Sequence, residues 1–338
     1  MNNKTNVAKY VVGRILLSIL ILFGVSFIMY FLIRLMPVSF FEEKFTPQLQ
    51  SGVMTREELD RILELYGMAD SSFLGILKGY FGWLGGVLRG DLGTSFATGD
   101  PVSEVIKSKM GISFGISFVS LILQLIIAIP LGIRCACKQY SKFDYTVTVV
   151  CMVLMAFPSF FFGNLLIKWF AVDLGWFETG GLVSSSLPKD ASWFTRLMDM
   201  GWHLILPMTV LVLLSLGGLM RYTRTNTLEV LNADYIRTAR AKGLSENKVV
   251  YKHVFRNTLI PLVTQLAFTL PGLFGGAMIT EEIFAIPGIG QTAYQALRMG
   301  DIPLAMGYNM FIAVLTVIGI LLADVMYAVV DPRVKLGG

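Results

Sequence analysis

The sequence predicts an all-α integral membrane protein with six transmembrane helices, and three observations carry this prediction. First, 54% of the 338 residues are hydrophobic and 15% are charged, whereas soluble proteins carry about 25% charged residues. Second, the apolar residues form six stretches long enough to cross a bilayer, for which a helix needs roughly 20 residues. Third, the mean hydropathy is +0.66, and the basic residues lie between these stretches. The net charge of +5 therefore does not indicate nucleic-acid binding.

The six predicted spans are nearly free of charge and are separated by polar loops. Their approximate limits are residues 11–36, 110–134, 145–168, 202–221, 257–281 and 303–329. The first is longer than the apolar part of a signal peptide, which has about 7–15 residues, and no small-x-small cleavage site follows it. We therefore expect it to be retained, and we expect residues 1–338 to form a single transmembrane domain.

Lys and Arg residues are distributed unequally between the two sides of these spans, which predicts their orientation. Sixteen flank one side, whereas the short loops of the opposite side hold four. Because cytoplasmic loops carry the excess of Lys and Arg, both termini are predicted to be cytoplasmic.

Residues 37–109 then form a long extracytoplasmic insertion between the first two spans. Within it, Thr55 and Glu58 have the spacing of a capping box, which predicts a helix that starts there. The insertion is either a solvated cap on the helix bundle or a docking surface for an extracytoplasmic partner.

The longest cytoplasmic connection, residues 222–256, is predicted to contain a helix, a turn and a second helix. The segment from Asp234 to Lys242 has good helix formers, with an acidic residue in its first turn and a cation in its last. Gly243 supplies the expected break, and Ser245 is a suitable N-cap for the next helix. An amphipathic segment on anionic lipid is the alternative, but Leu, Phe and Trp are sparse in the first helix, which favours a protein groove.

Residues 233–245, with the sequence ADYIRTARAKGLS, closely resemble the coupling-loop signature of ABC importer permeases. The resemblance is to the dipeptide, oligopeptide and nickel class of binding-protein-dependent inner-membrane components. The general importer motif begins Glu-Ala-Ala where this chain has Arg237-Thr238-Ala239, a variant that is usual in the peptide class. Supporting matches extend along nearly the whole chain and fall at residues 90–95, 158–160, 283–290 and 331–333.

This resemblance implies a type I ABC importer permease fold and a non-catalytic subunit that forms half of a translocation path for di- or oligopeptides. The family pairs two homologous permeases, expected here as a heterodimer, with two cytoplasmic ATPase subunits and an extracytoplasmic solute-binding protein. ATP and Mg²⁺ are expected on the ATPase subunits, and this chain is expected to bind no cofactor. The implied location is the inner membrane of a bacterial or archaeal cell.

Three alternatives stay open at this stage. Within the same class, the substrate is a nickel chelate or an oligosaccharide. In a different class, the chain is a carrier driven by an ion gradient, which would need coupling-ion sites and often internal repeats, and neither is clear in the sequence. A channel is the third alternative, although no repeat resembling a selectivity filter supports it.

The candidate functional residues fall into three groups. The predicted ATPase-coupling residues are Ala233, Asp234, Tyr235, Arg237, Thr238, Ala239, Arg240 and Gly243. Polar residues in or at the ends of spans are candidates for the substrate path or for partner contacts, namely Gln265, Glu281, Glu282 and Asn309. Asp324 lies within the last span, where a charge is costly, and it is expected to form a structural ion pair with a cation such as Arg333 or Arg14.

No catalytic or metal-binding residues are predicted. The chain contains no Gly-x-x-x-x-Gly-Lys-Ser/Thr motif for nucleotide phosphates, so ATP hydrolysis is expected on another subunit. Two histidines and three cysteines have no recognisable metal-ligand spacing.

Overall fold

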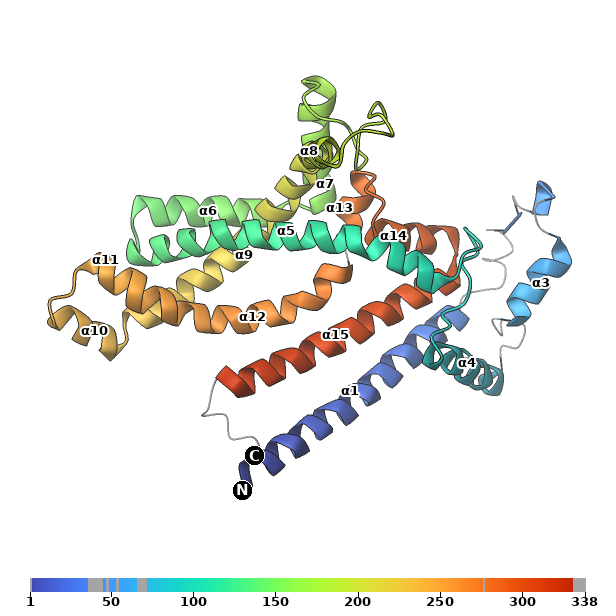
Figure 1. The fold of residues 1–338 in the computed structure, drawn as a ribbon, viewed down its shortest axis with the longest axis horizontal. Coiled ribbons are helices and arrows are strands. Elements are labelled where there is room, and N and C mark those ends of the chain that lie inside the picture. The colour runs from blue at the N-terminus through green and yellow to red at the C-terminus, as the bar shows by residue number, and fades with distance from the viewer. Residues whose placement is uncertain are drawn as a thin grey trace. The chain divides into compact units, whose positions relative to one another are not determined.

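The computed structural model describes residues 2–35, 45–46, 49–52, 55–65, 72–275 and 277–330. In this part of the chain the regular elements are α-helices and two short π-helices, without any β-strand. The chain divides into two compact units, Met1–Lys109 with Thr292–Gly338, and Met110–Gln291 (Figure 1).

The first unit is built on two long apolar helices that pack against each other, α1 and α15. Its described helices are α1 (Asn2–Arg34), α3 (Arg56–Leu65), α4 (Phe73–Leu88) and α15 (Ile302–Val330), with the start of α5 (Val102–Cys137) and most of α14 (Ile289–Met299). Helix α4 packs on α1 through Tyr80, which is fully buried. The Tyr80 hydroxyl donates to the Phe23 carbonyl at 3.2 Å, and the Ser26 hydroxyl lies 2.9 Å from it.

Side-chain caps fix the ends of two elements in this unit. The predicted capping box at the start of α3 is confirmed, since Glu58 accepts from the Thr55 amide at 2.8 Å and Thr55 accepts from the Glu58 amide at 3.2 Å. Asp301 is buried before the start of α15, where it accepts from the Leu304 amide and from the Ser95 hydroxyl. The loop before α5 is thereby attached to α15.

The second unit contains the packed helices that carry the loop predicted to have a function. Its described helices, besides most of α5, are α6 (Lys142–Ala156), α7 (Ser159–Leu166), η1 (Ile167–Asp173), α8 (Trp193–His203), α9 (Ile205–Leu231), α10 (Asp234–Ala241), α11 (Glu246–Lys248), η2 (Val249–Val254), α12 (Phe255–Gly275) and α13 (Met278–Ile283).

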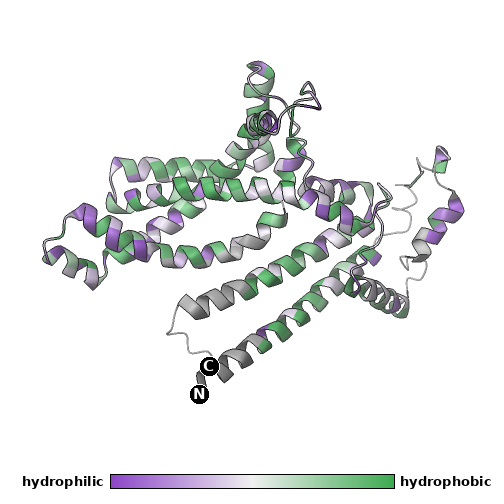
Figure 2. Ribbon diagram, viewed as in Figure 1, coloured by the Kyte–Doolittle hydropathy of each residue, from purple (hydrophilic) through white to green (hydrophobic). Residues whose placement is uncertain are grey.

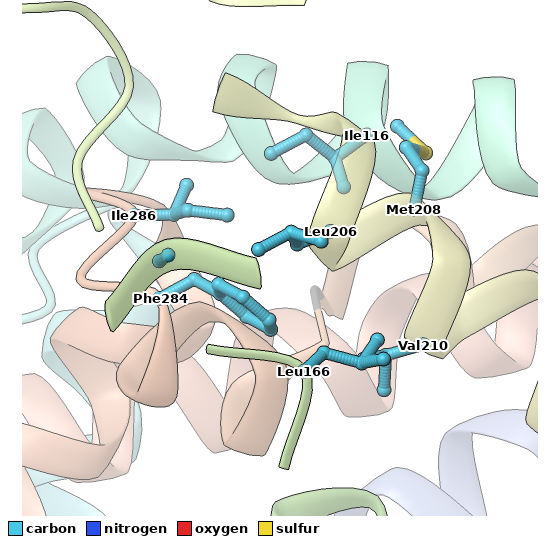
Figure 3. Packing of buried hydrophobic residues seen from close by; sticks show 8 residues of the cluster. Ile116, Leu166, Leu206, Met208, Val210, Phe284 and Ile286 are labelled. Atoms are coloured by element: carbon cyan, nitrogen blue, oxygen red, sulfur yellow. The ribbon is translucent and has the colours of Figure 1, made fainter. Parts of the chain in front are cut away.

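Small residues allow α9 to approach its neighbours closely. A Cβ atom at Gly217 would lie 2.9 Å from the Cys151 carbonyl of α6, and one at Gly132 of α5 would lie 2.7 Å from the Met220 carbonyl. Helix backbones approach this closely in membranes where the interface carries Gly, Ala, Ser or Thr. Apolar side chains from α5, α7, α9 and the segment after α13 form the adjoining core shown in Figure 3, with Ile116, Leu166, Leu206, Met208, Val210, Phe284 and Ile286.

Among the described residues, four helices are long and apolar enough to cross a membrane: Val12–Arg34, Val102–Cys137, Ile205–Leu231 and Ile302–Leu321. Figure 2 shows the hydrophobic character of these helices and the more polar character of α10. A fifth is counted if Lys142–Ala156 and Ser159–Asp173 form one span.

The predicted span 145–168 is not one straight helix. Helix α6 ends at Ala156, and the two parts are bent by 98°. Pro158 explains the break, because a proline disfavours the helical conformation in the residue before it, and Phe157 is extended.

Candidate functional site

The loop between α9 and α12 contains a helix, a tight turn and a second helix, as its sequence predicts. Helix α10 runs from Asp234 to Ala241, with Ala233 in the extended N-cap conformation. Helix α11 begins after Ser245 and continues through η2 into α12 without a break. Figure 1 shows α10 and α11 at the end of α9 that is remote from α8.

One face of α10 holds the loop together through apolar contacts. Ile236 is fully buried and Ala239 is 7% exposed, and both pack with the buried Val249 and Val254 of η2. The spacing of three residues places Ile236 and Ala239 on one helical face. Ala239 is one of the predicted ATPase-coupling residues, and its side chain packs inside the loop.

The other face of α10 is exposed and polar. The side chains of Asp234 and Arg237 are 96% and 72% exposed, and their closest charged atoms lie 3.7 Å apart. Tyr235 is 49% exposed. Thr238 is exposed as well, and its hydroxyl donates to the Asp234 carbonyl at 2.9 Å. A rigid helix thus offers a charged and aromatic surface to solvent or to a partner.

Arg240 bridges the two helices of the loop. Its Nε donates to Glu246 Oε1 at 2.7 Å and its Nη2 donates to Oε2 at 3.3 Å. Through these bonds the Glu246 carboxylate raises the pKa of the Arg240 guanidinium above its usual value. Arg240 is one of the predicted ATPase-coupling residues, and the structure gives it an acidic partner within the loop.

Gly243 makes the turn between these two helices. Its φ is +75°, in the left-handed region that residues other than glycine rarely adopt. Its amide donates to the Arg240 carbonyl at 2.9 Å, and the next amide, of Leu244, donates to the Ala239 carbonyl. The turn therefore depends on backbone conformation more than on space, since nothing lies within 4 Å of a Cβ built at Gly243.

A buried ion pair, which the sequence does not predict, joins α6 to α9 near the base of this loop. Arg224, on the last turns of α9, donates to both carboxylate oxygens of Asp144 at 2.8 and 2.7 Å. Asp144 lies in the first turn of α6, where it also accepts from the Tyr140 amide at 3.0 Å. Its side chain is 4% exposed, and that of Arg224 is 23% exposed.

A cleft of about 1240 Å³ lies beside the loop. Its lining includes Arg134 and Lys138 from the end of α5, and Arg240, Glu246 and Tyr251 from the loop. Since Arg240 and Glu246 neutralise each other, the remaining charge of these lining residues is positive. The loop thus packs on itself through Ile236 and Ala239, and it borders the cleft with Arg240, Glu246 and Tyr251.

Glu281, a candidate for substrate or partner contact, lies inside the second unit. It is 1% exposed, and its carboxylate accepts from the amides of Ala277 at 3.1 Å and Gln291 at 3.0 Å. A Cβ atom at Gly288 would clash with the same carboxylate. Glu281 therefore organises the segment between α13 and α14, a role that its position at a predicted span end did not reveal.

The other candidates are dispersed. Glu282 is half-buried in α13, and Gln265 is exposed on α12. Asn309 is exposed on α15 and donates to the Ala305 carbonyl of the same helix. The predicted ion pair of Asp324 and Arg333 lies outside the residues whose side chains are described.

The fold defines a multi-pass membrane protein, because several of its helices can cross a bilayer. Residues 128–336 match the family described as binding-protein-dependent transport system inner membrane component. The chain belongs to this family, which makes it a permease subunit of an ABC importer.

Related proteins extend this likeness to nearly the full chain. The oligopeptide transport system permease protein AppB of Bacillus subtilis (strain 168) is 39% identical over 329 residues, which cover 97% of this chain and 99% of the relative. The dipeptide transport system permease protein DppB of Alkalihalophilus pseudofirmus is 32% identical over 343 residues, covering 96% and 99%. A solved structure of the MetNI methionine ABC transporter in inward-facing conformations matches in fold, with a TM-score of 0.52 and 19% identity, covering 67% of this chain and 96% of that one.

Proposed function

We propose that this permease forms half of the path by which an ABC importer carries di- or oligopeptides across the membrane. The likeness to AppB, named for oligopeptide transport and matched over 97% of this chain, is the observation that carries the proposal. A relative named for dipeptide transport matches over a similar length. Uptake of nickel chelates or oligosaccharides is the alternative within the class.

The proposed topology has six spans with both termini in the cytoplasm. The uneven distribution of Lys and Arg supports it. The bent pair α6 and α7–η1 would supply the third span, and α12, with 21 residues, would supply the fifth. Residues 37–109 would then be an extracytoplasmic insertion, and residues 222–256 a cytoplasmic loop.

Cysteine labelling tests this topology. A cysteine at Asn247 should react only from the cytoplasmic face, and one at Ser72 only from the outside. Labelling of both positions from the same face would refute the six-span arrangement.

Coupling to ATP hydrolysis is the proposed role of α10. The exposed side chains of Asp234, Tyr235 and Arg237 supply a surface for an ATPase subunit, while Ile236 anchors the helix from behind. The Gly243 turn and the ion pair of Arg240 with Glu246 fix α10 relative to η2. A displacement of α10 would therefore be transmitted through η2 to α12.

The proposed assembly contains a second homologous permease, two cytoplasmic ATPase subunits and an extracytoplasmic solute-binding protein. ATP and Mg²⁺ would bind to the ATPase subunits, and this chain would contribute no catalytic residue. Glu282, Gln265 and Asn309 are the polar residues proposed for the substrate path or for contacts with neighbouring subunits.

Reconstitution into proteoliposomes tests the function. The chain, its paired permease, the ATPase subunits and the solute-binding protein should together take up a labelled di- or oligopeptide when ATP is supplied. Nickel chelates and oligosaccharides should not compete with the peptide. Uptake of either of these, with no uptake of peptides, would refute the substrate assignment. Uptake driven by an ion gradient without ATP would refute the class.

A further inference from the structure

Helix α8 (Trp193–His203) is amphipathic, and it turns its apolar face away from the protein. Five large apolar side chains form a stripe along that face and are each at least half exposed: Trp193, Phe194, Leu197, Met198 and Trp202, at 76%, 58%, 54%, 62% and 52%. Residues four positions apart lie on one face of a helix. The stripe lies along two such series, positions 193, 197 and 201 and positions 194, 198 and 202. No charged residue interrupts this stripe.

The polar face of α8 is the one that contacts the protein. Asp199 accepts from the amide and the hydroxyl of Ser184 at 2.7 and 2.6 Å. His203 is 8% exposed, and its Nδ1 lies 2.9 Å from the Asp199 carbonyl oxygen. A helix on the surface of a soluble protein buries its apolar face against the core. The opposite arrangement here means that an apolar environment outside the chain covers the stripe.

Tryptophan is concentrated around this helix. Four of the five tryptophans of the chain, Trp169, Trp176, Trp193 and Trp202, fall within residues 169–202, and each is at least half exposed. The Trp202 ring stacks on Phe177 with centroids 4.9 Å apart, and its Nε1 donates to the Trp176 carbonyl at 3.2 Å. Trp is enriched where a membrane meets water, because its ring is apolar and its N–H is polar.

The connection to α9 places α8 at a membrane boundary. Only Leu204 separates the end of α8 from the start of α9. Helix α9 has 27 residues and is therefore about 40 Å long at a rise of about 1.5 Å per residue. The hydrocarbon core of a bilayer is about 30 Å thick. When α9 crosses the membrane, its two ends thus lie at or beyond the surfaces of this core. The α8 end is the one remote from the coupling loop.

We propose that α8 binds the headgroup region of the phospholipid bilayer, with its stripe of Trp193, Phe194, Leu197, Met198 and Trp202 inserted among the acyl chains, and so anchors this end of α9 at a fixed depth. Helix η1 also exposes large apolar side chains, Trp169 and Val172, at 50% and 63%.

Spin labels on opposite faces of α8 test the proposal in the complete transporter, reconstituted in nanodiscs of phosphatidylethanolamine and phosphatidylglycerol. The native cysteines are first replaced by alanine, and each variant must retain ATP-dependent uptake. Spin labels on the cysteines introduced by M198C and L197C should collide several-fold more often with oxygen, which dissolves in lipid, than with a water-soluble nickel chelate. A label attached after R196C should show the opposite preference, because Arg196 is exposed and lies on the side of the helix opposite the stripe.

Two results would overturn the proposal. If the labels at positions 198 and 196 favour the nickel chelate equally, the stripe lies in water. If the Met198 label is shielded from both reagents, another protein subunit covers it. Fluorescence of the native tryptophans gives a second measurement without substitution. Lipids brominated close to the headgroup should quench it more than lipids brominated near the chain ends, and the reverse order would place the stripe too deep for an interfacial anchor.

Discussion

Removal of the Arg224 side chain should destabilise the permease and loosen its coupling loop. The variant Arg224→Ala leaves the Asp144 carboxylate, 4% exposed, without two charge-assisted hydrogen bonds of 2.8 and 2.7 Å. The bond from the Tyr140 amide remains. Each such bond contributes about 1.5–3 kcal/mol, and breaking a buried ion pair on one side costs about 3–5 kcal/mol. We therefore expect a loss of about 3–5 kcal/mol in unfolding free energy.

Denaturant unfolding of the purified permease in detergent measures this loss, and a double-mutant cycle assigns it. Asp144→Ala alone should destabilise by a similar amount, whereas Asp144→Ala with Arg224→Ala should cost much less than the sum, because no buried charge is left unpaired. Arg224→Lys should recover only part of the stability, since an ammonium group cannot form the bidentate pair. In the full transporter, Arg224→Ala should lower uptake more than ATP hydrolysis. If each single variant cost less than about 1 kcal/mol, the value for exposed pairs, the pair would not hold the loop.

Four further tests address the roles proposed for individual residues. Gly243→Val should uncouple ATP hydrolysis from uptake while leaving subunit assembly intact, because a β-branched residue at φ +75° costs about 1–3 kcal/mol of backbone strain; normal coupled uptake would refute this. Arg240→Glu should impair coupling, and the exchange Arg240→Glu with Glu246→Arg should restore it, whereas a failed rescue would mean that Arg240 acts on a partner. Arg237→Glu should weaken copurification of the ATPase subunits, with unchanged permease stability as the control. Gly288→Ala should lower the unfolding midpoint of the permease, because the alanine Cβ would clash with the buried Glu281 carboxylate. An unchanged midpoint would show that the segment around Glu281 has room for a methyl group.

The helix, turn and second helix between α9 and α12 could be predicted because their signals are local. The helix formers between Asp234 and Lys242 and the glycine that follows fixed both ends of α10 to within one residue of the structure. The capping box at Thr55 could be predicted for the same reason. Such features depend on neighbours within four residues, which the sequence shows directly.

Features that depend on distant partners could not be predicted. Asp144 and Arg224 are 80 positions apart, and nothing in the composition of either segment indicates that they meet. Glu281 looks like an acidic residue at a wet helix end, and only the path of the chain after α13 brings amide groups to its carboxylate. The inward face of Ala239 likewise follows from its packing on η2.

Helix α9 connects the proposed membrane anchor, α8, to the proposed coupling helix, α10. One residue separates α9 from α8 and two residues separate it from α10, so we expect a motion of α10 to move α9. If α8 holds the far end at a fixed depth in the interface, that motion becomes a tilt of α9, and a tilt is what opens or closes a path between helices. The double variant Trp193→Ser with Trp202→Ser should therefore lower the number of substrate molecules transported per ATP, while ATP hydrolysis and ATPase binding stay near normal. The same exchange at Trp83, which packs against the core of the other unit, should instead lower stability. Unchanged coupling in the double variant would show that α9 transmits its motion without an anchor.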